Sequence, residues 1–101
     1  VLPAVLPGRR HVFNQYIVRF PEGSKRRDSV MAALKAAGIG CEIYYPLPLP
    51  DQQCFRQLPS AGRPYPNSRA ASEQTLAIPI FPELTREQIA TVVEVIVKAL
   101  R

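Results

Sequence analysis

The stretch TREQIATVVEVIVKAL, residues 85–100, carries the clearest structural signal in this chain of 101 residues. Its first four residues form a capping box, in which the Thr85 hydroxyl accepts a hydrogen bond from the Gln88 amide and the Gln88 side chain reaches back to Thr85. Apolar residues then recur at helical spacing along one face. The stretch therefore predicts an amphipathic helix with one buried face, formed by Ile89, Val92, Val93, Ile96 and Leu100.

Three other stretches alternate or concentrate apolar residues as strands do: HVFNQYIVRF at 11–20, CEIYY at 41–45 and LAIPI at 76–80. Pro79 confines the third strand to an edge or an end of its sheet. A helix is expected from Ser24 or Asp28 to Ala37, where Gly38 supplies the left-handed residue that ends a helix. A shorter helix fits residues 67–75.

The resulting order is strand, helix, strand, proline-rich loop, strand, helix. It predicts an α+β fold, a two-layer sandwich in which two main helices pack on one face of a small three-stranded sheet. Residues 1–10, with two prolines and Gly8, are interpreted as a lead-in from something upstream, and residues 11–101 as one domain. The loop over 46–66 holds six prolines in 21 residues, and long loops of this kind are more often functional than accidental.

Composition excludes several classes of protein. With 47% hydrophobic and 21% charged residues, the chain is not a disordered tail, a collagen or a coiled coil. No apolar run approaches the ~20 residues of a membrane span, and no secretory signal is visible, so we expect a cytoplasmic protein without a membrane partner. The net charge of +5 comes without a nucleic-acid-binding motif, so no nucleic-acid partner is expected, and the basic run 25–27 is interpreted as solvated.

The sequence shows no pattern typical of a metal site or of a catalytic nucleophile. Cys41 and Cys54 are too few and too far apart for a zinc site, His11 is the single histidine, and Cys41 fits a small core residue. The feature that suits a ligand is a polar and aromatic cluster of Asn14, Gln15, Tyr16, Tyr44 and Tyr45 beside the proline-rich loop. An alternative of equal weight is that these tyrosines only cover an edge of the sheet and bind no ligand.

Three motifs, HVFNQYIVRF, AAGIGCEIYYPLPL and LAIPIFPELTREQI, resemble in this order and spacing the C-terminal small domain of the DegT-type family. These proteins are sugar aminotransferases of fold type I that depend on pyridoxal phosphate (PLP). The resemblance covers about residues 10–100. It implies that a large N-terminal domain, which carries the Schiff-base lysine and most of the PLP site, is the missing partner of this chain.

The resemblance also implies what this chain lacks. Lys25, Lys35 and Lys98 do not match the family's lysine motif, so the chain alone is expected to hold no catalytic or PLP-binding residue and to be inactive. The whole protein is expected to bind PLP, to act on a nucleotide-linked keto-sugar and to form a homodimer.

By position, Tyr44 and Tyr45 match the family's aromatic pair before a proline, which is associated with substrate binding. Asn14 and Gln15 match a strand segment that faces the cofactor side. One departure is Pro50, which stands where the family usually has a histidine. Two hypotheses follow: a substrate-side domain of such an aminotransferase, or a stand-alone, non-catalytic binding or oligomerisation module of the same fold.

Overall fold

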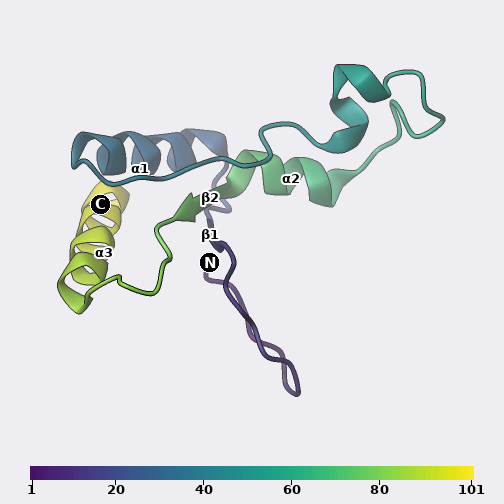
Figure 1. The fold of residues 1–101 in the computed structure, drawn as a ribbon. Helices are drawn as coiled ribbons and strands as arrows, with labels where there is room; N and C mark the ends of the chain where they lie inside the picture. Colours follow the sequence, from purple (N-terminus) through teal and green to yellow (C-terminus); the bar gives the residue numbers. More distant parts are fainter.

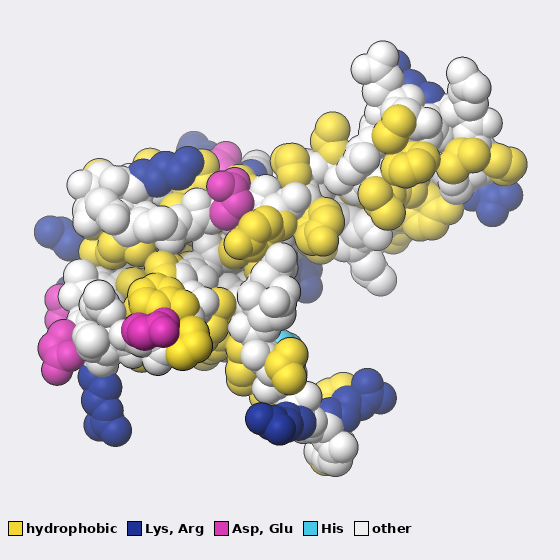
Figure 2. All heavy atoms as spheres, viewed as in Figure 1, with side chains coloured by type: hydrophobic (Ala, Val, Ile, Leu, Met, Phe, Trp, Pro, Cys, Tyr) yellow, Lys and Arg dark blue, Asp and Glu magenta, His cyan; other side chains and the backbone are white.

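The computed structural model describes all 101 residues and contains three α-helices, two short 3₁₀ turns and one sheet (Figure 1). The proline-rich segment with α2 projects to one side of the molecule, and the N-terminal residues form an arm on another (Figure 1). Hydrophobic side chains lie on the surface of the projecting part (Figure 2). In chain order the elements are β1 (Tyr16–Arg19), α1 (Ser24–Ala36), η1 (Leu49–Asp51), η2 (Gln53–Phe55), α2 (Pro66–Gln74), β2 (Thr75–Ile78) and α3 (Arg86–Leu100).

The core confirms the predicted two-layer α+β arrangement. Val18 of β1 and Leu76 of β2 pair with each other and are buried on one face of the sheet, together with Phe20, which directly follows β1. Helices α1 and α3 both cover this face, and they contribute the rest of the cluster: Val30 and Leu34 from α1, and Val92 from α3. No helix of the structure has both the length and the apolar composition needed to cross a bilayer.

The sheet has two strands, not the three expected. Strands β1 and β2 pair antiparallel, and the segment 41–45 meets β2 only where Glu42 and Ala77 exchange both backbone hydrogen bonds. The ladder cannot continue in either direction from this bridge. Pro79, two residues after Ala77, has no N–H to donate to the segment 41–45. On the other side, the Thr75 N–H already donates to the Ala71 carbonyl as the cap of α2.

The first strand is also shorter than the stretch 11–20 suggests. Phe13 has a φ of 48°, which places it in the left-handed region that a side chain with a Cβ rarely adopts. Its ring stacks on both the His11 and Tyr16 rings, with centroids 4.1 and 5.5 Å away. Regular pairing therefore starts only at Tyr16.

Local helix signals are confirmed. The Thr85 hydroxyl accepts from the Gln88 amide at 3.2 Å, and the Gln88 side chain accepts from the Thr85 amide at 2.9 Å. At the end of α1, Gly38 has a φ of 71° and the Ile39 N–H donates to the Leu34 carbonyl, as a glycine cap requires. The short helix expected at 67–75 is α2.

The apolar stripe of α3, however, is not buried as a unit. Val92 is 7% exposed, whereas Ile89 and Val93 are 46% and 51% exposed and Leu100 is 37% exposed. Residues Val95, Ile96 and Ala99 pack partly against the core instead. The predicted face is therefore confirmed for Val92 and Ile96 and wrong for Ile89, Val93 and Leu100, because the helix turns only one edge of its apolar arc toward α1 and the sheet.

Candidate functional site

One hollow of about 390 Å³ is lined by four of the five residues of the predicted polar and aromatic cluster, Asn14, Gln15, Tyr16 and Tyr44, and we call it the Asn14–Tyr44 hollow. Asn14 and Gln15 lie just before β1, and Tyr44 follows the bridge at Glu42. The opposite side of the hollow is formed by the end of β2 and the apolar residues after it, Pro79, Ile80 and Phe81. Asn14 and Gln15 thus meet Tyr44 around one concavity, although at least 29 positions separate them in the sequence.

Glu42 is the single charged residue that lines this hollow, and the sequence patterns did not single it out. Both backbone hydrogen bonds to Ala77 hold its main chain, and its Oε1 accepts from the Ile43 amide at 3.0 Å. Amide, hydroxyl and carboxylate groups beside an apolar wall offer hydrogen-bond donors and acceptors together with a surface for a ring. This combination suits a ligand that carries several hydroxyl groups.

Tyr45 lies elsewhere. It lines a second hollow of about 510 Å³ between the proline-rich segment and α2, which we call the Tyr45 hollow. Consecutive residues of extended backbone point to opposite sides, so Tyr44 and Tyr45 separate after the bridge. Pro50, at the position where the family usually has histidine, lines the Tyr45 hollow, as does Tyr65, which the sequence patterns did not reveal.

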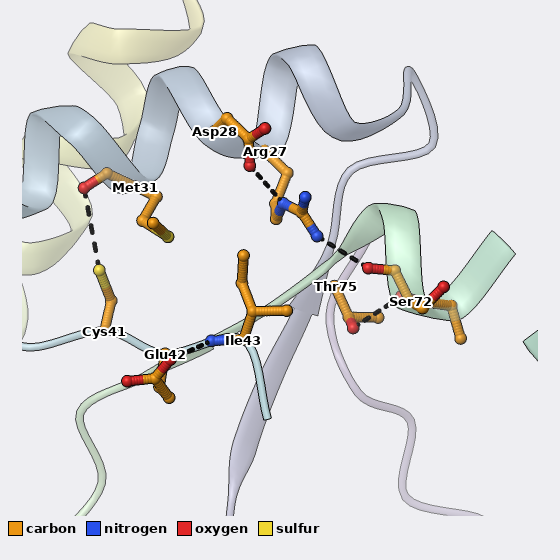
Figure 3. A network of polar contacts seen from close by, with 9 residues as sticks. Arg27, Asp28, Met31, Cys41, Glu42, Ile43, Ser72 and Thr75 are labelled. Carbon is orange, nitrogen blue, oxygen red and sulfur yellow. Dashed lines mark hydrogen bonds and ion pairs between the residues drawn. The ribbon is translucent and has the colours of Figure 1, made fainter. Parts of the chain in front are cut away.

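Helices α1 and α2 are joined by the buried side chain of Arg27 (Figure 3). Arg27 of α1 is 8% exposed, and its guanidinium donates to the Ser72 carbonyl of α2 at 2.8 Å and to the Asp28 carboxylate at 2.7 Å. The interpretation of the basic run 25–27 as wholly solvated is therefore wrong for Arg27. Farther out, an ion pair of 2.9 Å joins Arg69 of α2 to Asp51 in the proline-rich segment.

Cys41 is half-buried against the core, as expected for a small core residue, and it also lines the Asn14–Tyr44 hollow. Burial raises the pKa of its thiol, against the opposing effect of the nearby Lys35. Its Sγ lies 3.8 Å from the Met31 carbonyl of α1, a weak hydrogen bond visible in Figure 3. The raised pKa favours the protonated thiol of Cys41 over the thiolate.

Comparison with known proteins identifies the family. The model of the DegT/DnrJ/EryC1/StrS aminotransferase family matches residues 2–97. The chain belongs to this family. Among solved structures, an aminotransferase of the same family from Brucella abortus superposes with a TM-score of 0.84 at 28% identity, over 96% of this chain and 25% of the other.

Two named proteins are similar to this chain over nearly its whole length. A protein called pleiotropic regulatory protein in Geobacillus stearothermophilus is 42% identical over all 101 residues of this chain, which cover 26% of that protein. A UDP-N-acetyl-3-dehydro-α-D-glucosamine 3-aminotransferase of Acidithiobacillus ferrooxidans is 38% identical over 98% of this chain and 25% of its own length. The chain thus spans about a quarter of the length of the relatives it matches.

The lining of the Asn14–Tyr44 hollow does not by itself fit PLP. The group needs a lysine to carry it and positive or N–H donors for its phosphate. Neither Lys25, Lys35 and Lys98 nor any arginine lines the Asn14–Tyr44 hollow, whose one charged group, Glu42, is negative. No chemical step is therefore assigned to PLP on residues of this chain.

Proposed function

We propose that this chain is the C-terminal, substrate-side domain of a PLP-dependent aminotransferase that acts on nucleotide-linked keto-sugars. The Asn14–Tyr44 hollow borders the sugar, with Asn14, Gln15 and Tyr44 as its contacts, and Tyr45 contributes from the neighbouring hollow. The observation that carries the proposal is the meeting of two separate family motifs, at 14–15 and at 44, around one concavity lined by hydrogen-bonding groups.

The remainder of the proposed enzyme lies in the three quarters of the relatives' length that this chain does not span. That part holds PLP, which supplies the electron sink for transamination when bound. The 101 residues alone are inactive, because no lysine of this chain reaches the hollow. We take the whole enzyme to be a homodimer, as the family resemblance implies, and to be cytoplasmic.

Substitution in the hollow of the full-length protein tests the proposal. Asn14→Ala and Tyr44→Ala should each raise KM for a nucleotide-linked keto-sugar several-fold, since each removes a hydrogen-bonding group from the sugar surface. The visible absorbance of the PLP–protein complex should stay unchanged. Asn67→Ala, the same substitution at an exposed position outside both hollows, is the control and should leave KM unaltered.

Unchanged KM values in both hollow variants would remove the substrate-side role. The second candidate function, a non-catalytic binding or oligomerisation module, is favoured by one observation: the 42% identical relative has a regulatory rather than an enzymatic name. It predicts that the full-length protein shows no transamination and that PLP addition gives no Schiff-base absorbance that borohydride abolishes.

A further inference from the structure

Glu42 gives the Asn14–Tyr44 hollow a net negative charge. It is the one charged residue among the 12 that line the hollow, and no lysine or arginine is among them. Neither of the two ion pairs of the molecule involves Glu42. The negative charge at the hollow is therefore not compensated by a basic side chain of this chain.

Strand geometry explains why the Glu42 side chain lies at the hollow. Glu42 and Ala77 exchange both backbone hydrogen bonds, so their side chains lie on the same face of the sheet. This face is opposite the one on which Leu76 is buried, because successive residues of a strand alternate between faces. Ala77 and Tyr44 both line the hollow together with Glu42. The carboxylate is thus placed beside the hydrogen-bonding groups and not against the core.

The carboxylate of Glu42 is also held in position. Its Oε1 accepts a hydrogen bond from the Ile43 amide at 3.0 Å, as Figure 3 shows. The other oxygen, Oε2, has no hydrogen-bond partner within the chain and is open to a ligand. A carboxylate in this state accepts a hydrogen bond from a neutral hydroxyl group but repels a second carboxylate.

We propose that Glu42 determines substrate specificity by selecting nucleotide-linked sugars without a charged substituent over uronates, which carry a carboxylate on the sugar. This inference rests on the proposed function, because it takes the Asn14–Tyr44 hollow to border the sugar. For two like charges about 6 Å apart, Coulomb's law gives a loss of affinity between about threefold in bulk water and about 100-fold at the effective dielectric constant of a protein surface. This chain offers a uronate no basic residue at the hollow to offset that loss.

Two ligands that differ only at C6 of the sugar test the selection. Calorimetry on the full-length protein gives the dissociation constants of UDP-N-acetylglucosamine and of its C6 uronate. We expect the unsubstituted protein to bind the neutral sugar about tenfold more tightly than the uronate. Glu42→Gln, which keeps the shape and removes the charge, should bring the ratio of the two constants close to one, and Glu42→Lys should invert it. Glu73→Gln, an exposed acid of α2 outside both hollows, is the control and should leave the ratio unaltered.

A uronate bound as tightly as the neutral sugar would overturn the proposal, and so would a ratio that Glu42→Gln leaves unaltered. Asn14→Ala separates this failure from failure of the proposed function. If Asn14→Ala weakens the binding of both sugars while the ratio ignores the charge at position 42, the selection is wrong and the substrate-side role stands. If neither sugar binds, or if neither responds to Asn14→Ala or Tyr44→Ala, the substrate-side role is wrong and the selection falls with it.

Discussion

Val92 and Val93 are adjacent valines of α3 with opposite environments, and replacing each with alanine measures how the helix is docked. A Val→Ala change removes two methyl groups, worth about 1.6 kcal/mol when fully buried. Val92 is 7% exposed and Val93 is 51% exposed. When the transfer free energy is multiplied by the buried fraction of each side chain, the loss is about 1.5 kcal/mol at Val92 and about 0.8 kcal/mol at Val93.

A cavity adds to the cost only at the buried position. A void of roughly 40 Å³ at Val92 costs about 1 kcal/mol more, while solvent fills the space at Val93. The gain in helix propensity from valine to alanine, about 0.5 kcal/mol, is common to both variants and cancels in the comparison. Val92→Ala should therefore be less stable than Val93→Ala by about 1.5–2 kcal/mol.

Urea unfolding of the 101-residue chain, followed by far-UV circular dichroism, gives both free energies of unfolding. Denaturation slopes equal to that of the unsubstituted chain are required for the comparison. Two variants whose stabilities agree within ~0.5 kcal/mol would refute the one-sided docking of α3.

Three further substitutions or measurements have defined outcomes. In the full-length protein, Tyr45→Phe should lower kcat/KM for the nucleotide-sugar by an amount worth about 1 kcal/mol, because it removes one neutral hydrogen bond. Tyr45→Ala should lower it several-fold more. A lower melting temperature with an unchanged KM would instead make Tyr45 a structural residue. Arg27→Met should lower the free energy of unfolding by about 1.5–3 kcal/mol, because it removes a charged hydrogen bond between α1 and α2. Lys25→Met, at an exposed position of the same helix, is the control and should change the free energy of unfolding by less than ~0.5 kcal/mol. Cys41 should alkylate more slowly than the exposed Cys54 at neutral pH, with a rate that goes on rising above the ordinary thiol range; equal rates would contradict its burial.

Sequence patterns predicted those elements that local interactions determine. The capping box at Thr85 and the glycine cap at Gly38 each involve residues within one turn of one another, so their geometry follows from the sequence alone. The two-layer arrangement followed as well, because the apolar stripes of the helices and the alternation in the strands leave few ways to bury both.

What depends on distant partners could not be predicted. The stretch CEIYY has the alternation of a strand, but it pairs with β2 at Glu42 alone. On that edge of β2, Pro79 has no N–H, and the N–H of Thr75 already caps α2. In the same way, periodicity identified the apolar arc of α3 but could not show which edge of the arc meets the core.

The residues of the candidate site also differ in how far the sequence could predict them. Family motifs indicated Asn14, Gln15 and Tyr44, which the fold brings to one hollow. Tyr45 follows Tyr44 directly, and only the backbone direction after the bridge shows that it belongs to a different hollow. Glu42 has no motif around it, and its place in the hollow comes from a bridge that the sequence does not reveal.

A crystal structure of the full-length protein with a nucleotide-linked amino-sugar bound would test the substrate-side role most directly. The account predicts that the sugar lies in the Asn14–Tyr44 hollow, with the Asn14 amide or the Tyr44 hydroxyl within hydrogen-bond distance of a sugar hydroxyl. A sugar bound wholly by residues outside this chain, with the hollow filled by another part of the protein, would contradict it.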